Sequence, residues 1–122
     1  MKMVLDDAPG LNLIASYEPG RVKIRGRFHT VSLVIYPREL DTDWPASSVG
    51  DLDNEALRSI IRKAPELVII GTGETQQFPD PRVFIPFMDA GIGYEVMDNT
   101  AACRTFNILI SEGRQAALAL LA

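Results

Sequence analysis

Two short apolar runs limit the folds open to this chain more than any other feature of its sequence. Residues 30–36 read TVSLVIY and residues 67–70 read LVII, and both are rich in β-branched side chains. A strand with one face in water alternates apolar and polar residues, whereas a strand covered on both faces reads as an almost continuous apolar run. We therefore expect two strands in a sheet that has structure packed on both of its faces.

Helix and strand signals alternate from residue 51 onward. The first predicted helix begins at Asp51 or Asp53, whose carboxylate can accept hydrogen bonds from first-turn amides, and it ends before Pro65. The sequence then predicts a short helix over residues 80–90, a strand over 92–97 and a third helix over 101–111, for which residues 98–100 supply capping oxygens and which Gly113 ends. Because parallel strands need helical crossovers, this alternation predicts an α/β sheet.

The first third of the chain is predicted to form a β-hairpin layer, with residues 11–18 and 21–29 joined by the turn dipeptide Pro19-Gly20. A continuous strand over the second segment places its basic residues, which occupy every second position, on one face: Arg21, Lys23, Arg25 and Arg27. The opposite face then carries Val22, Ile24 and Phe28. This basic face could dock an acidic partner, an anionic lipid or a phosphate, or it could be a solvated surface that protects the strand from aggregation.

Composition narrows the possible functions. A chain of 122 residues fits one domain over residues 1–122, and a net charge of -4 disfavours nucleic-acid binding. The single cysteine, Cys103, excludes an internal disulfide, and with one histidine, His29, it predicts no metal cluster. No apolar run could span a bilayer, and acids in residues 1–7 interrupt the core that a signal peptide needs, so we expect a cytoplasmic protein.

The strand at residues 67–70 runs directly into Gly71-Thr72-Gly73-Glu74, which begins like a phosphate-binding turn. A dinucleotide fingerprint needs a third small residue and a helix that starts at the turn. Gln76 occupies that third position, and prolines at 79 and 81 delay the helix. We predict a tight turn without a nucleotide cofactor, and leave open that the turn lines a ligand crevice.

A second polar motif lies in DNTAACRTFNILISEGR, residues 98–114. Helical spacing places Arg104, Asn107 and Ser111 on one face. Arg104 could bind an anion or carboxylate together with the free amides of the helix start, or it could pair internally with Glu74 or Glu112. Cys103, in the first turn, could be an activated thiol or a small core residue.

These two motifs and the apolar tail resemble the Mth-nine-three-eight-like domain family, a domain of unknown function that includes a mitochondrial respiratory complex I assembly factor. The resemblance extends from about Gly10 to Leu121 and depends on G-T-G-E, T-A-A-C-R-T-[YF]-N and E-G-R occurring in this order. It implies a three-layer α/β fold with a central mixed sheet. It also implies that residues 114–121 form a last strand antiparallel to its neighbours, although their alanines and leucines favour a helix locally.

The resemblance also implies a set of residues that form either a shared pocket or a structural framework. These are Gly71, Gly73, Glu74, Thr100, Cys103, Arg104, Asn107, Glu112, Gly113 and Arg114. Phe106 stands where tyrosine is usual in the family, which removes the hydroxyl that a catalytic phenol would need. The family implies no established catalytic activity and no cofactor, and the lack of a mitochondrial presequence suggests a bacterial relative or a processed form.

Two functions remain open. The first is a non-enzymatic binding or assembly module that acts through protein contacts, could work near a membrane, and uses the face from Arg21 to Arg27. The second is a small-molecule anion-binding protein or enzyme that uses a crevice near Gly73, Glu74 and Arg104. The sequence identifies neither the partner nor the oligomeric state.

Overall fold

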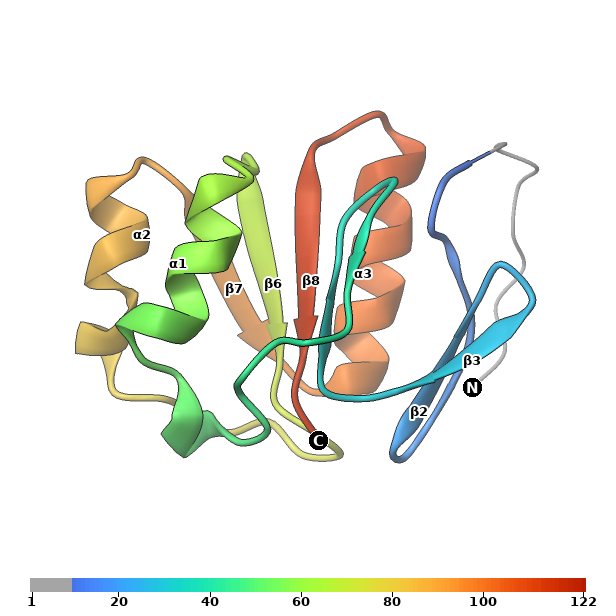
Figure 1. The fold of residues 1–122 in the computed structure, drawn as a ribbon, viewed down its shortest axis with the longest axis horizontal. Helices are drawn as coiled ribbons and strands as arrows, with labels where there is room; N and C mark the ends of the chain where they lie inside the picture. Colours follow the sequence, from blue (N-terminus) through green and yellow to red (C-terminus); the bar gives the residue numbers. More distant parts are fainter. Residues whose placement is uncertain (1–9) are drawn as a thin grey trace.

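A computed structural model describes residues 10–122 of the chain, so the interpretation of residues 1–7 concerns a segment outside the described part. It contains a three-stranded antiparallel sheet in the order β1-β2-β3 and a five-stranded mixed sheet in the order β5-β4-β8-β6-β7 (Figure 1). The predicted α/β class, with a central mixed sheet and an added N-terminal hairpin layer, is confirmed.

The elements are short, and their bounds are as follows. The small sheet comprises β1 (Ile14–Glu18), β2 (Arg21–Ile24) and β3 (Arg27–Thr30). The main sheet comprises β4 (Leu33–Ile35), β5 (Leu40–Asp41), β6 (Leu67–Gly71), β7 (Gly93–Met97) and β8 (Ala116–Leu120). The helices are α1 (Asn54–Arg62), α2 (Ile85–Asp89) and α3 (Asn99–Ser111), with 3-10 turns η1 (Val49–Asp51) and η2 (Pro81–Phe84).

The main sheet is covered on both faces, as its apolar strands predict. In β8, Leu118 and Leu120 face the cluster built with α3 and the hairpin, whereas Ala117 and Ala119 face the cluster built with α1 and α2. All four residues are fully buried. Figure 1 shows α1 and α2 on one side of the sheet and α3 and the hairpin on the other. Every side chain of β8 thus removes apolar surface from water, and this burial outweighs the local helical preference of the tail.

The expectation for the last strand is correct on one side and wrong on the other. β8 pairs antiparallel with β4, where Leu33 lies opposite Leu120, but it pairs parallel with β6, where Leu67 lies opposite Ala116. The reason is topological: α3 carries the chain back across the sheet after β7, so β8 starts at the same end as β6 and β7. β4 enters from the hairpin without such a crossover.

Side-chain caps fix where the two longer helices begin. Asp53 accepts a hydrogen bond from the Ala56 N–H (2.9 Å) at the start of α1, and Asp98 accepts one from the Ala101 N–H (2.9 Å) at the start of α3. Of the two caps considered for the first helix, Asp53 is the one used, because Asp51 binds Ser47 and Ser48 and closes η1 instead. These caps satisfy amides that have no partner within their helix.

Candidate functional site

The glycine turn closes the carboxyl end of β6, as predicted. Gly73 adopts a φ of 103°, which is open to glycine but strained for other residues. Its N–H donates to Asn99 Oδ1 (3.1 Å), and the Asn99 N–H donates to the Gly73 carbonyl (2.8 Å). The start of α3 therefore lies directly against the turn.

Asn99 is the residue at this end that sequence reasoning missed. Its side chain is fully buried, and Nδ2 donates both to the Tyr17 hydroxyl (3.0 Å) and to the Leu121 carbonyl (2.8 Å). One amide group thus joins the ends of β6, β8 and β1. The available signal was its place in the helical stripe that α3 buries, which is otherwise apolar and comprises Asn99, Ala102, Cys103, Phe106 and Ile110.

Thr72 organises the loop that follows β6. Its buried hydroxyl donates to the Thr75 carbonyl (2.8 Å) and accepts from the Gln77 N–H (2.9 Å). A phosphate-binding loop instead points its backbone amides at the ligand. Here the amides of Gly73 and Gln77 already donate to side chains of the protein.

The two candidate residues on the first turns of α3 lie in opposite environments. Cys103 is fully buried, and this burial raises the pKa of its thiol to about 12. The thiol therefore stays protonated, which supports the core interpretation over the activated one. Arg104 points into solvent, and within residues 10–122 it forms no ion pair with Glu74 or Glu112.

The remaining motif residues do not converge on the glycine turn. Asn107 binds the backbone of Ile14 on β1, accepting from its N–H (2.7 Å) and donating to its carbonyl (3.0 Å). Glu112 ends α3, and Arg114 pairs with Glu66 (3.2 Å) at an exposed site. Since α3 has 13 residues, these last groups lie roughly 20 Å from its start.

The motif set is therefore spread along the whole of α3. Gly71 is buried against Asn99, Thr100 is half-buried in the first turn, and Glu74 is exposed beyond the glycine turn. That these residues form a shared pocket stays a prediction. The geometry instead supports a framework that fixes the turn, the helix and the hairpin relative to one another.

The predicted basic face of the hairpin is wrong in its register. Arg25 and Gly26 adopt φ values of 50° and 81° and form a two-residue turn between β2 and β3. Arg27 then lies opposite Ile24, and Phe28 lies opposite Lys23. Residues paired in this way share a face, so Arg27 joins the inward face and Phe28 joins the outer face with Arg21 and Lys23.

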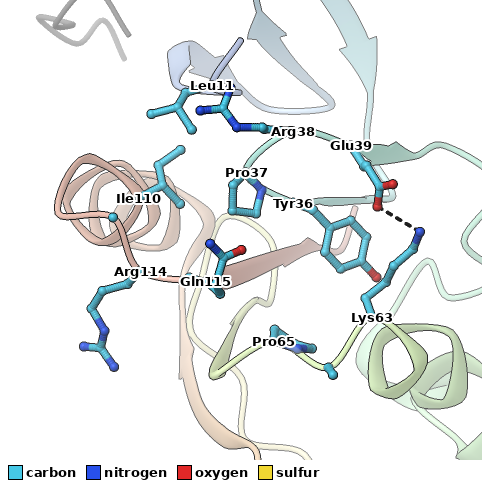
Figure 2. Close-up of a pocket in the computed structure, with 13 residues that line it drawn as sticks. Leu11, Tyr36, Pro37, Arg38, Glu39, Lys63, Pro65, Ile110, Arg114 and Gln115 are labelled. Atoms are coloured by element: carbon cyan, nitrogen blue, oxygen red, sulfur yellow. Dashed lines mark ion pairs between the residues drawn. The ribbon is translucent and has the colours of Figure 1, made fainter. Parts of the chain in front are cut away.

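A hollow of about 430 Å³ lies at the opposite end of the sheet from the glycine turn, where β6 and β8 begin (Figure 2). Arg38, Lys63 and Arg114 line it, and Lys63 Nζ pairs with Glu39 Oε2 (2.8 Å). Tyr36 also lines it, and burial, reinforced by Asp41 and Glu39, raises the pKa of its phenol. None of these residues except Arg114 belongs to the predicted site.

A second hollow, which we term the basic hollow, adjoins the first and has a volume of about 340 Å³. It lies between the β2–β3 turn and the β4–β5 turn, and its lining comprises Asn12, Ile24, Arg25, Arg27, His29, Arg38, Glu39 and Leu40. Arg38 and Glu39 line both hollows. Two of the four predicted docking cations, Arg25 and Arg27, therefore lie at this hollow.

Comparison with known proteins assigns the chain to a family. Residues 14–121 match the family described as "Protein of unknown function (DUF498/DUF598)". The chain belongs to this family. A crystal structure from Bordetella parapertussis is 32% identical with a TM-score of 0.84, covering 93% of this chain and 98% of that one. A solution structure from Bordetella pertussis, described as a Mth938-like domain, is 27% identical with a TM-score of 0.81, covering 99% and 92%. The resemblance seen in the motifs is thereby confirmed.

Curated relatives of this DUF498 chain include proteins named NADH dehydrogenase [ubiquinone] 1 alpha subcomplex assembly factor 3. The Xenopus tropicalis protein is 35% identical over 80 residues, which cover 64% of this chain and 44% of that protein. The Bos taurus protein is 29% identical over 117 residues, which cover 94% and 63%. The chain thus spans less than two thirds of these relatives.

The cellular location of this DUF498 chain stays a prediction. A Francisella tularensis relative, 32% identical over 66 residues that cover 54% of each protein, is named 13 kDa major membrane protein. Within residues 10–122, no helix combines the length and the hydrophobicity needed to cross a bilayer. The expected cytoplasmic location is neither confirmed nor contradicted by these two findings.

Proposed function

We propose that this chain is a non-enzymatic binding module that assists the assembly of a protein complex, in a role like that of the assembly factors named among its relatives. The outer face of the hairpin is the structural observation that carries the proposal. Phe28 is 47% exposed there, although aromatic side chains of this size are usually more deeply buried. The guanidinium carbon of Arg21 lies 3.9 Å from the centre of its ring, and Lys23 Nζ lies 5.4 Å from it.

An exposed aromatic ring beside two cations has the composition of a protein-docking surface. Aromatic residues and arginine are enriched where interfaces are buried, and ring and guanidinium together offer apolar area with directed charge. Although the net charge of the whole chain is -4, this face carries Arg21 and Lys23 and is complementary to an acidic segment of a partner. Arg21 is held in place by Glu18, whose carboxylate accepts from Nε at 2.9 Å.

The groups that a catalytic site would use support the non-enzymatic interpretation. The Cys103 thiol is buried with its pKa raised, and the amide of Gly73 donates to Asn99. Both groups are engaged in holding the fold. We therefore place the function at the surface of the hairpin.

Affinity capture from the native cell tests this proposal. The tagged chain is compared with a double variant, Arg21→Glu with Phe28→Ala, and with Arg104→Glu as a control for an exposed cation on α3. We expect the double variant to lose a partner that the unaltered chain and the control both retain. An unchanged set of captured proteins would contradict the proposal. Capture from the membrane fraction and the soluble fraction separately also tests the predicted cytoplasmic location.

The alternative function, anion binding at a crevice near Gly73, Glu74 and Arg104, receives no specific support from the geometry. None of the hollows described above is lined by these residues. The direct test is Arg104→Ala: this alternative predicts that the substitution abolishes binding of an anionic metabolite to the folded protein. Retention of such binding would exclude this crevice as the site.

A further inference from the structure

The strand β7 lies at one end of the main sheet and pairs on one side only, with β6. The Gly93 N–H and the Met97 carbonyl both form hydrogen bonds toward the β6 side. Backbone groups of successive residues in a strand point to opposite edges, so the residues at even positions between these two, Tyr94 and Val96, direct their N–H and carbonyl groups away from the sheet. This outer edge of β7 is a row of backbone donors and acceptors.

One of these outward groups already binds a side chain. Gln76, in the loop that follows β6, donates from Nε2 to the Val96 carbonyl (2.9 Å). Within residues 10–122, no hydrogen bond reaches the Tyr94 N–H, the Tyr94 carbonyl or the Val96 N–H. Gly93 and Glu95, on either side of Tyr94, are exposed. An added strand can therefore bond to three adjacent backbone groups.

The two edges of the main sheet differ in length. The strand at the other edge, β5, has two residues, whereas β7 has five. Very short edge strands are one way in which proteins prevent unwanted pairing of sheets. The edge of β7 lacks this protection and is long enough to support the pairing of an extended segment.

The chain around this edge is acidic. Residues 83–103 include Asp89, Glu95 and Asp98 but no lysine, arginine or histidine. Glu95 is exposed and forms no ion pair within the described part of the chain. Two copies of the chain paired antiparallel about Glu95 would place their carboxylates directly opposite each other, which is destabilising. A strand that carries a lysine or arginine at this position is stabilised instead.

An exposed aromatic side chain lies close to the same edge. Phe78 is 80% exposed and follows Gln76 by two residues, so the chain between them spans at most about 7 Å. The loop is held in place by Gln76 and by the Thr72 hydroxyl, which accepts from the Gln77 N–H (2.9 Å). A ring presented by an ordered loop loses little conformational entropy when a partner covers it.

We propose that the outer edge of β7 binds an extended segment of a partner protein, which adds a strand to the main sheet and places a basic side chain beside Glu95. In this mode of recognition, main-chain hydrogen bonds supply affinity and alternate side chains supply specificity. The proposal uses no residue of the hairpin, so it can fail while the proposed docking role of the hairpin stands, and the reverse also holds.

Hydrogen exchange of the full chain, followed by NMR, tests whether the edge is open. We expect the amides of Tyr94 and Val96 to exchange on the order of a hundredfold faster than those of Gly93 and Glu95, which face β6. Equal protection of all four amides in the free protein would overturn the proposal, because the edge would already be covered. Protection that increases with protein concentration would also overturn it, because the occupant would then be a second copy.

A phage-displayed library of random peptides tests the occupant. We expect selection on the unaltered protein to enrich segments that are rich in β-branched residues and contain lysine or arginine. A synthetic peptide of the enriched sequence should slow the exchange of the Tyr94 and Val96 amides. Its binding should weaken about fivefold in Glu95→Lys. The matched control is Glu112→Lys, the same change at an exposed residue at the end of α3, and it should bind as the unaltered protein does.

A second pair of variants tests the backbone itself. Val96→Pro removes an N–H that does not serve the pairing with β6, and proline is tolerated at such positions of edge strands. Val96→Ala shortens the same side chain but keeps the N–H. We expect peptide binding to weaken at least about fivefold more in Val96→Pro than in Val96→Ala. Thermal unfolding verifies that each variant is folded, and the Glu95→Lys comparison decides the matter if Val96→Pro is not.

Two results of the peptide experiments would overturn the proposal. The first is that no enriched peptide protects the amides of Tyr94 and Val96. The second is an equal loss of binding in Glu95→Lys and Glu112→Lys, because the charge at the edge would then have no specific role.

Discussion

The two ends of the main sheet use polar groups in opposite ways. At the carboxyl ends of β6 and β8, Asn99 bonds to the Gly73 N–H and to the Leu121 carbonyl, and its side chain is buried. At the other end, Arg38, Lys63 and Arg114 line a hollow that is open to solvent (Figure 2). The family motif G-T-G-E and the start of T-A-A-C-R-T-F-N lie at the closed end.

A sequence motif can be recognisable because it binds a ligand or because it holds the fold together, and the difference between the two ends distinguishes these cases. An open α/β sheet commonly binds its ligand at the carboxyl ends of its strands. In this chain those ends are closed by protein groups, so the glycines serve the close approach of α3 to β6. The hollows described above lie elsewhere, beside the hairpin and at the amino ends of β6 and β8. If this contrast is right, substitutions at the closed end should lower the free energy of unfolding strongly, and substitutions at the open end should lower it little.

The largest expected effect is that of Asn99→Ala. The change leaves the buried Gly73 N–H and Leu121 carbonyl without their partner and removes the bond to Tyr17. Each unsatisfied buried group costs roughly 1–3 kcal/mol, so we expect the free energy of unfolding to fall by about 3–5 kcal/mol. Urea denaturation measures it.

Two other asparagines calibrate that result. Asn107→Ala, which frees the backbone of Ile14 at a half-buried site, should cost about 1–2 kcal/mol. Asn54→Ala, at an exposed position in α1, should cost less than about 0.5 kcal/mol. A loss in Asn99→Ala no larger than that in Asn54→Ala would show that the closed end does not depend on this network.

The next effect in size is that of Gly71→Ala. A Cβ at this position meets Asn99 Oδ1 and lies 2.8 Å from a methyl group of Leu120, so β6 and α3 must separate. Such overpacking costs roughly 1–3 kcal/mol. Gly93→Ala is the matched control in the neighbouring strand, where the nearest atom lies 3.6 Å away and the stability should barely change. Equal stability of the two variants would contradict the close packing described here.

Sequence reasoning succeeded where the signal lies within a few neighbouring residues, and it failed where the outcome depends on contacts with distant parts of the chain. The apolar runs predicted buried strands, and Asp53 and Asp98 marked helix starts, because each effect acts within a few residues. The prediction of the basic face was wrong because basic residues continue at every second position through Arg25-Gly26, whereas the turn there changes which face the following residues occupy.

The candidate site was limited in the same way. Asn99 acts through contacts with residues far along the chain, and its place in the buried stripe of α3 indicates burial but does not identify those partners. Likewise, the basic hollow joins Arg27 to Arg38 only because two turns meet in space. The direction of the last strand required knowledge of which strands it would pair with.

The third prediction concerns alkaline pH. Burial raises the pKa of Cys103 from 9.0 to about 12 in the folded protein, so the unfolded chain releases this proton first. The stability that the neutral thiol contributes is complete below about pH 9 and is lost as the pH rises toward 12. By about pH 10.5 the unaltered protein should lose roughly 2 kcal/mol more than Cys103→Ala does, relative to neutral pH.

Urea unfolding at a series of pH values measures this difference. Tyr36, whose pKa is also raised by burial, contributes equally to both proteins and cancels in the comparison. The pKa of Tyr17 is raised by burial and also by the charge of Cys103, so its contribution differs between the two proteins and is followed separately by the ultraviolet absorbance of the ionised phenol. Parallel curves for the unaltered protein and Cys103→Ala would mean that the thiol is accessible to water. The activated-thiol interpretation would then regain support.

The smallest effects on stability are expected for two exposed arginines, Arg27 beside the basic hollow and Arg104 on α3. Arg27→Gln and Arg104→Gln should each change the free energy of unfolding by less than about 0.5 kcal/mol, because both side chains are exposed and neither is part of an ion pair within residues 10–122. Urea denaturation of the two variants, measured beside Asn99→Ala, places both ends on one scale. A stabilisation by Arg27→Gln larger than that limit would sharpen the comparison, since it would reveal repulsion between Arg27 and a neighbouring cation. A destabilisation as large as that of Gly71→Ala would instead show that Arg27 holds the hairpin to the body of the protein, and the contrast between a closed end and an open end would fail.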